Sequence, residues 1–301
     1  MKKVGIILLI LISLIGCTPK SEKNSNNLEI VTSFYPMYIA TLNITDGAEN
    51  ISVTNLTSTD VGCLHDYQLT TANMLMLNEA DILIINGGGM ESFVQKAIDN
   101  CENLKIINAS EGILEIHNEE HETTHEEHEH NHGENAHIWV SVSLYIEQVE
   151  NIRNELCKIN PKNAEVYNKN AEEYINKLEK LKLEMHSELD NIINKDIVTF
   201  HEAFEFFAEE FDLNIVAVIE REPGTYPSAG ELVDIIKIVE KTDAKAIFTE
   251  PQYFENAANI IANETGRKLY ELDPIVSGEF TKEAYEEAMR ENLKTLIKAL
   301  K

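Results

Sequence analysis

The stretch 163–193 most constrains the fold of this chain, because it contains neither glycine nor proline. Its apolar residues recur near the spacing of one face of a helix, at Val166, Tyr167, Tyr174, Leu178, Leu181, Met185 and Leu189. At 1.5 Å per residue this helix would be about 45 Å long, which is longer than an ordinary domain helix. We therefore interpret it as a helix that connects two parts of the chain.

Short β-rich runs alternate with helical stretches on both sides of that helix. Strands are expected at 29–33, 51–55, 81–85 and 105–108 before it, and at 197–200, 215–219, 246–249 and 268–272 after it. This alternation predicts an α/β fold with two Rossmann-like lobes, each a mainly parallel sheet flanked by helices, joined by one long connecting helix. We place the N-terminal lobe at 28–143, the connecting helices at 144–194 and the C-terminal lobe at 195–301.

The N-terminus indicates the compartment. A basic start precedes the apolar run 4–15, which is too short to cross a bilayer comfortably. It ends in Leu14-Ile15-Gly16-Cys17, which resembles the lipobox of bacterial lipoproteins. We expect a signal peptide at 1–16, a lipidated Cys17, a polar tether at 17–27, and a protein anchored by lipid on the extracytoplasmic face of the cell membrane. The alternative is an ordinary secretory signal that ends in a chance cysteine.

The formal net charge of −27 excludes a generic role in binding nucleic acid, which needs clustered lysine and arginine. It fits a surface protein that attracts cations. Apart from Cys17, the cysteines are Cys63, Cys101 and Cys157, an odd number. One disulfide is possible, and the sequence leaves its pairing open.

The run HNEEHETTHEEHEHNHGENAH, residues 117–137, mixes imidazole and carboxylate side chains with almost nothing apolar. Such a composition cannot bury a core, so we expect a solvated loop over 117–136. Imidazole nitrogen suits Zn²⁺, so the loop histidines are candidate auxiliary ligands. They are His117, His121, His125, His128, His130 and His132. A plain solvated charge run is the alternative, and a cloned affinity tag would sit at a terminus.

Three further histidines, His65, His137 and His201, lie at expected strand or loop ends, where open α/β sheets bind ligands. Each alone could equally be a satisfied core or capping residue. Asp273 directly follows an expected strand and precedes Pro274, so it is the best candidate for a fourth ligand. Three histidines and one aspartate would give Zn²⁺ a tetrahedral N/O site.

The chain resembles the zinc and manganese substrate-binding lipoproteins of bacterial ABC importers, the group with a rigid helix between two lobes. The resemblance rests on GCLHDYQLTTANMLMLNEADILIINGGGMESFVQKA, ENAHIWVSV, VTFHEAFEFFAEEFDL, EREPGTYPSAGEL, AIFTEPQY and LYELDPI, in the family's order. It implies that His65, His137, His201 and Asp273 are the metal ligands, and that Glu250 is a second-shell or structural residue near the cleft. The first motif departs from the family pattern at Leu64 and Gln68.

The resemblance also implies a function. A His-rich insertion before the second histidine is similar to zinc-specific members, and His201 stands where manganese members have a glutamate. We therefore expect an extracytoplasmic, monomeric, high-affinity zinc-binding protein that delivers Zn(II) to the permease of an ABC importer and is not an enzyme. Because neutral imidazole is the ligand, binding should fail below about pH 6. A manganese- or iron-binding member of the same family is the alternative.

Two further readings come from other classes of protein. His121-Glu122-Thr123-Thr124-His125 matches the H-E-x-x-H motif of zinc peptidases. That motif requires a helix with an apolar stripe, which the flanking Glu, Asn and His residues do not supply. A surface adhesin is the other reading, but no repeat or adhesive module can be identified in the sequence.

Overall fold

The structure is a computed structural model that describes residues 27–58, 64, 67–98, 101, 103–113, 135–220, 226–252 and 256–301. Several residues singled out from the sequence lie outside these ranges. They are Cys17, Cys63, His65 and the six histidines of 117–132.

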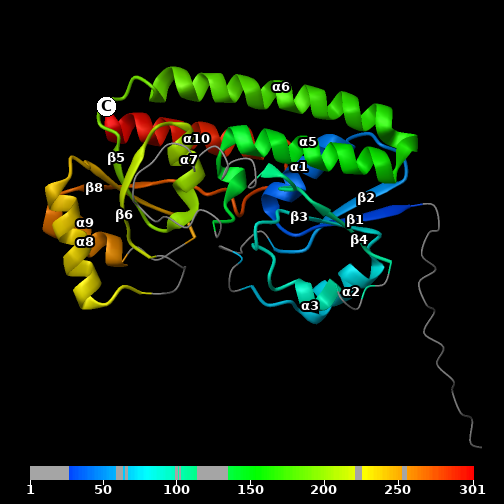
Figure 1. Ribbon diagram of the computed structural model, residues 1–301, viewed down its shortest axis with the longest axis horizontal. Coiled ribbons are helices and arrows are strands. Elements are labelled where there is room, and N and C mark those ends of the chain that lie inside the picture. The colour runs from blue at the N-terminus through cyan, green and yellow to red at the C-terminus, as the bar shows by residue number, and fades with distance from the viewer. Residues whose placement is uncertain are drawn as a thin grey trace, which may run out of the picture.

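The N-terminal sheet contains β1 (Leu28–Thr32), β2 (Ile51–Asn55), β3 (Ile82–Ile85) and β4 (Lys105–Asn108) in the order β2-β1-β3-β4. Every pairing in it is parallel, as the alternating pattern predicts. Helix α1 (Tyr35–Thr45) covers one face, and α2 (Thr71–Glu79) and α3 (Gln95–Ile98) cover the other (Figure 1). Alternate strand residues are buried under each layer, Ile30 on one side and Val31 on the other.

The C-terminal sheet repeats this design with β5 (Asp196–Thr199), β6 (Asn214–Val218), β7 (Ala246–Thr249) and β8 (Lys268–Glu271). Its order is β6-β5-β7-β8, and all pairs are parallel. Helices α8 (Ala229–Lys241) and α9 (Asn256–Thr265) pack against a core of their own with β5, β6 and β7. Helices α7 (Glu205–Glu210) and α10 (Ala284–Leu300) pack into the main core instead.

One long helix runs from one lobe to the other. This helix is α6 (Ala164–Leu189), which contacts α1 in one lobe and α10 in the other and therefore runs over both lobes (Figure 1). Helix α5 (Val142–Ile159) packs along it. Helix α6 ends at Leu189, four residues before the predicted end at Ile193. The chain turns there because Ile192 enters the core, while Ile193 is fully exposed.

One continuous set of buried side chains runs through both lobes and through α5, α6 and α10. It includes the fully buried Trp139, Tyr145, Tyr174 and Tyr285. The lobes and the connecting helix therefore share one core. Within the described ranges, no helix has the length and apolar character needed to cross a bilayer.

Candidate metal centre

His201 and Glu250 meet because their strands are neighbours. Strand β5 pairs in parallel with β7, so the carboxyl ends of both strands lie at the same edge of the sheet. His201 follows β5, and Glu250 directly follows β7. After β5 the sheet extends towards β6 on one side and towards β7 and β8 on the other, which creates the kind of switch point where open α/β sheets bind ligands.

The His201 ring is oriented by the Glu250 carboxylate. Its Nδ1 atom forms a hydrogen bond with Oε1 of Glu250, and both residues are buried. A carboxylate oxygen accepts this bond, so Nδ1 carries the hydrogen and the lone pair of the neutral ring lies on Nε2. An outer carboxylate that fixes a histidine tautomer is a common companion of metal-binding histidines.

His137 lies just before the short 3₁₀ helix η3 (Ile138–Val140) and has no exposed surface. The sequence places a fully buried Trp139 two residues later, and this ring packs edge-on against Phe34 and beside the His137 ring. The Nδ1 atom of His137 lies 2.8 Å from Oδ1 of Asn135. The second histidine is thus also held through Nδ1 by an oxygen atom.

The Nε2 sides of the two rings face each other. Nε2 of His137 and Nε2 of His201 are 3.3 Å apart, and the ring planes cross at 74°. Two nitrogens that each lie about 2.0–2.1 Å from a tetrahedral zinc ion are separated by roughly 3.3–3.4 Å. The spacing of these two nitrogens therefore fits two ligands of one tetrahedral ion.

Asp273 follows β8 at the same edge of the C-terminal sheet. Its carboxylate accepts bonds at Oδ1 from the backbone N–H of Ile275 (2.8 Å) and from Nε2 of Gln252 (3.4 Å). Asn292 of α10 holds its backbone, accepting from the N–H and donating to the carbonyl, both at 2.8 Å. Burial raises the pKa of Asp273, and the bonds from Ile275 and Gln252 oppose that shift.

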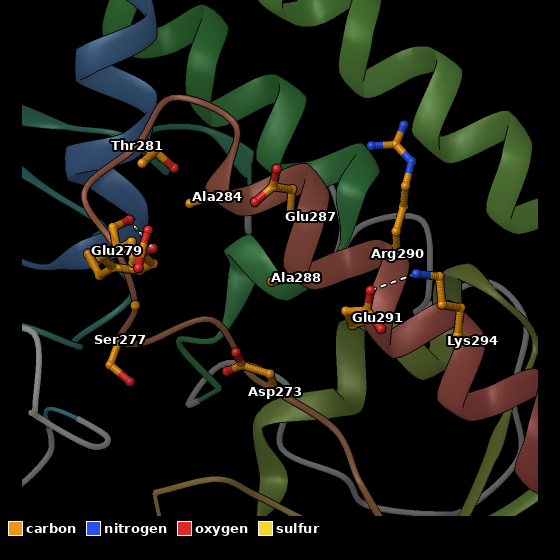
Figure 2. A pocket seen from close by; sticks show the side chains of 12 residues that line it. Asp273, Ser277, Glu279, Thr281, Ala284, Glu287, Ala288, Arg290, Glu291 and Lys294 are labelled. Carbon is orange, nitrogen blue, oxygen red and sulfur yellow. Dashed lines mark hydrogen bonds and ion pairs between the residues drawn. The ribbon is translucent and has the colours of Figure 1, made fainter.

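Asp273 also lines a surface pocket of about 520 Å³, together with Tyr35, residues of the following loop and the first turns of α10 (Figure 2). The adjacent Pro274 links Asp273 to the His137 segment. The indole N–H of Trp139, two residues after His137, donates to the Pro274 carbonyl at 2.7 Å. The loop that carries Asp273 is thereby bonded to the segment that carries His137.

The described part of the chain contains the His137–His201 pair, with Glu250 bound to one ring. Within the described ranges, no three His, Cys, Asp or Glu side chains are grouped as a complete metal site. His65 and the auxiliary histidines His117, His121, His125, His128, His130 and His132 lie outside those ranges. His186, which we expect to be a solvated helix residue, is on α6 and pairs with Asp190 at 2.9 Å.

Sequence reasoning missed Asn135. The expected solvated loop extended to 136, but Asn135 and Ala136 are buried. The asparagine tolerates burial because its amide binds His137 as well as Glu202 and Glu205 of the other lobe. Its position two residues before His137, next to an apolar run, was the available signal.

Comparison with known proteins identifies the family of the chain. Residues 30–299 match the family model described as "Zinc-uptake complex component A periplasmic". The chain is 31% identical to the zinc-binding lipoprotein AdcA of Streptococcus pneumoniae over 98% of its own length, and it spans 60% of that longer protein. It is also 31% identical to the high-affinity zinc uptake system protein ZnuA of Bacillus subtilis, over 93% of this chain and 90% of that protein.

A solved structure is similar over the same region. FpvC from Pseudomonas aeruginosa, determined in complex with Mn²⁺, superposes with a TM-score of 0.78 at 27% identity. The match covers 91% of this chain and 98% of FpvC. Sequence and fold therefore point to the same group of metal-binding proteins.

Proposed function

We infer, from the premise that the chain belongs to the zinc-uptake complex component A family, that it captures Zn(II) outside the cell membrane and delivers it to an ABC importer. The proposal covers binding and release of the ion, with no covalent step. It includes the lipid anchor at Cys17, a monomeric protein and a transmembrane permease as the partner.

The observation that carries the proposal is the 3.3 Å separation of the two Nε2 atoms. Two neutral imidazoles whose lone pairs converge repel each other unless a cation lies between them. We propose that His65 and Asp273 complete the site with His137 and His201. The carboxylates of Asp273 and Glu250 would then balance the two charges of the ion, which lowers the cost of burying it.

Zinc is the preferred cargo because nitrogen ligands predominate in the proposed set. Imidazole suits Zn²⁺, whereas Mn²⁺ prefers carboxylate, carbonyl and water ligands and is lower in the divalent affinity order. The names of the AdcA and ZnuA relatives agree with this choice. Manganese is the second candidate, since FpvC was determined with Mn²⁺ bound.

The His-rich loop has a separate role in this proposal. The composition of residues 117–132 offers almost nothing apolar to bury, so binding an ion there would have to offset the conformational entropy of ordering the chain, and we expect these sites to be weaker than the buried one. We propose that the loop histidines collect zinc near the membrane and pass it to the buried site. The two other classes make different predictions. An adhesin would support adhesion without transporting metal, and a peptidase would show proteolysis that a chelator inhibits.

Metal analysis of the isolated protein, followed by calorimetric competition between Zn²⁺ and Mn²⁺, tests the proposal. We expect one tightly bound zinc ion that excess manganese does not displace, together with weaker zinc sites. Displacement of zinc by equimolar manganese would show that manganese, and not zinc, is the preferred cargo. Absence of any tight divalent site would refute it.

A further inference from the structure

Asn135 connects the two histidines through its side-chain amide. Oδ1 accepts from the backbone N–H of His137 at 3.0 Å and contacts Nδ1 of the same residue at 2.8 Å. Nδ2 donates to the backbone carbonyl of Glu202 at 2.9 Å and to Oε2 of Glu205 at 2.8 Å. Glu202 directly follows His201, so one buried amide contacts the segments of both candidate ligands.

These four contacts allow only one orientation of the amide. The backbone N–H of His137 can only donate, so the atom that faces it must be the oxygen. The carbonyl of Glu202 can only accept, so the atom that faces it must be the NH₂ group. A flipped amide would place donor against donor at His137 and acceptor against acceptor at Glu202.

The fixed orientation determines the tautomer of His137. Because Oδ1 of Asn135 is an acceptor, the neutral His137 ring places its hydrogen on Nδ1 and its lone pair on Nε2. Glu250 imposes the same tautomer on His201. Both lone pairs then point into the 3.3 Å gap between the rings, as two ligands of one ion require.

The bonds from Nδ2 hold His137 next to the other lobe. The same part of the chain is attached there again at α7, where the Glu210 carboxylate accepts from the hydroxyls of Ser141 (2.7 Å) and Ser143 (2.6 Å). His137 comes from the chain before the connecting helix, and His201 from the chain after it. The Asn135 amide nevertheless ties their segments directly.

We propose that Asn135 is a positioning residue that presets the His137 tautomer and keeps His137 in register with His201. This rests on the proposed function only for the identity of the ion. The contacts of Asn135 restrict the His137 ring without involving the ion, so less of this ring's freedom is lost when it binds zinc.

Nitrogen-15 NMR of the histidine-labelled, metal-free protein at about pH 8, above the ordinary imidazole titration, tests the tautomer directly. In the wild type we expect His137 to have its hydrogen on Nδ1. The signal is assigned from its loss in His137→Gln. Asn135→Ala should populate the form with hydrogen on Nε2 and weaken zinc binding about 10- to 100-fold, as expected when an outer-shell partner is lost.

Two variants separate orientation of the ring from general stability. The double variant Asn135→Asp/Glu205→Gln retains an oxygen acceptor at Nδ1 and reverses the donor and acceptor in the contact between 135 and 205, but it loses the bond to the Glu202 carbonyl. It should restore the tautomer and only part of the zinc affinity. Ser143→Ala removes a bond of the same segment to α7 without touching His137, so it should change neither quantity.

The proposal is overturned if wild-type His137 carries its hydrogen on Nε2, a result that needs no variant to fold. It is also overturned if Asn135→Ala leaves both tautomer and zinc affinity unchanged. A wild-type protein with no tight zinc site would instead refute the proposed function, and the tautomer in the metal-free protein would still decide the role of Asn135.

Discussion

The Nε2 atoms of His137 and His201 lie 3.3 Å apart, although the two residues come from opposite sides of the connecting helix in the sequence. His137 is placed by the buried turn before η3, and His201 by the carboxyl end of β5. Each ring is held through Nδ1 by an oxygen atom, of Asn135 in one case and of Glu250 in the other. The arrangement leaves the same nitrogen of both rings available to one ion.

Replacing His201 with alanine should abolish tight zinc binding. The change removes one nitrogen ligand and leaves the Glu250 carboxylate buried without its ring partner. We expect the zinc affinity, measured by competition with a zinc chelator, to fall by more than about 100-fold. Loss of a residue that only supports a ligand typically costs up to about 100-fold, so loss of a ligand itself should cost more. His186→Ala is the matched control, since that histidine pairs with Asp190 on the surface of α6 and should not matter. Similar losses in both variants would contradict the assignment.

Deleting residues 117–132 should leave the tight site mostly intact. The deletion removes the candidate auxiliary histidines but retains Asn135 and His137 with their contacts. We expect the number of weak zinc ions per chain to fall in calorimetric titration, while the affinity of the tightest site stays within a few-fold of the wild type. If the deletion weakens that site as much as His201→Ala does, the loop itself is the primary site.

Gly278→Ala should disturb the loop that carries Asp273. Gly278 has φ = +153°, and a Cβ atom there would lie 2.5 Å from the Tyr35 hydroxyl oxygen. That hydroxyl donates to the Glu279 carbonyl at 2.6 Å, and both residues line the pocket of which Figure 2 gives a close view. Backbone strain and loss of this bond should lower the free energy of unfolding by about 1–3 kcal/mol, and zinc affinity should fall because Asp273 shifts.

A double-mutant cycle tests the cause of this effect. Tyr35→Phe removes the hydroxyl that the new methyl group would meet, so Gly278→Ala should cost less stability in that background. Gly266→Ala is the control for backbone strain alone, because Gly266 has φ = +69° with open space around its Cβ position. It should destabilise by roughly 1 kcal/mol and leave zinc affinity unchanged. Additive effects at positions 35 and 278 would contradict the steric explanation.

Much of the fold can be predicted from the sequence because its signals are local. Apolar periodicity indicates the connecting helix, and short β-rich runs between helical stretches indicate two parallel sheets, which the structure confirms. Strands 51–55, 105–108 and 246–249 have the predicted bounds. The helix ends at Leu189, where the chain turns and buries Ile192. This burial depends on tertiary packing, so the apolar periodicity of the sequence does not predict the boundary.

The site is less accessible to sequence reasoning. Histidines at strand ends can be identified one by one, but their pairing depends on which strands are neighbours. The contact between His201 and Glu250 follows from the β5–β7 pairing, which only the sheet order establishes. Asn135 lies at the end of the His- and Glu-rich tract, whose overall composition predicts a solvated loop. Its partners, Glu202 and Glu205, are distant in sequence, and composition cannot indicate such contacts.

Glu286 should make the stability of the metal-free protein depend on pH. It is buried on α10, and within the described structure its Oε2 atom has no hydrogen-bond partner. Burial raises its pKa to about 7, against the opposing effects of its own backbone N–H, Lys177 and Arg290 and with a small contribution from Glu283. In the folded protein the Glu286 carboxyl therefore keeps its proton up to about pH 7, whereas in the unfolded chain it loses the proton near pH 4.3.

The sign of the effect follows from linkage. Between about pH 4.3 and pH 7 the folded state binds more protons, so the free energy of unfolding decreases as pH rises through this window. The contribution of neutral Glu286 is complete below the unfolded pKa and is lost as pH passes about 7. Glu286→Gln keeps a neutral side chain at every pH, so it should stabilise the protein relative to the wild type at pH 8 by on the order of 2 kcal/mol, and little at pH 4.5.

Urea unfolding at a series of pH values, with chelator present to exclude stabilisation by zinc, measures this difference. Subtracting the wild-type curve from the variant curve removes the contributions of other buried acids, such as Glu91, whose pKa is also raised by burial. Glu287→Gln is the matched control, because Glu287 is exposed on the same helix and its substitution should leave the pH profile unchanged. If Glu286→Gln changes the stability by the same amount at both ends of the range, folding does not shift the pKa of Glu286. If it destabilises the protein at pH 8 and not at pH 4.5, the charged carboxylate is the stabilised form and the pKa shift has the opposite sign.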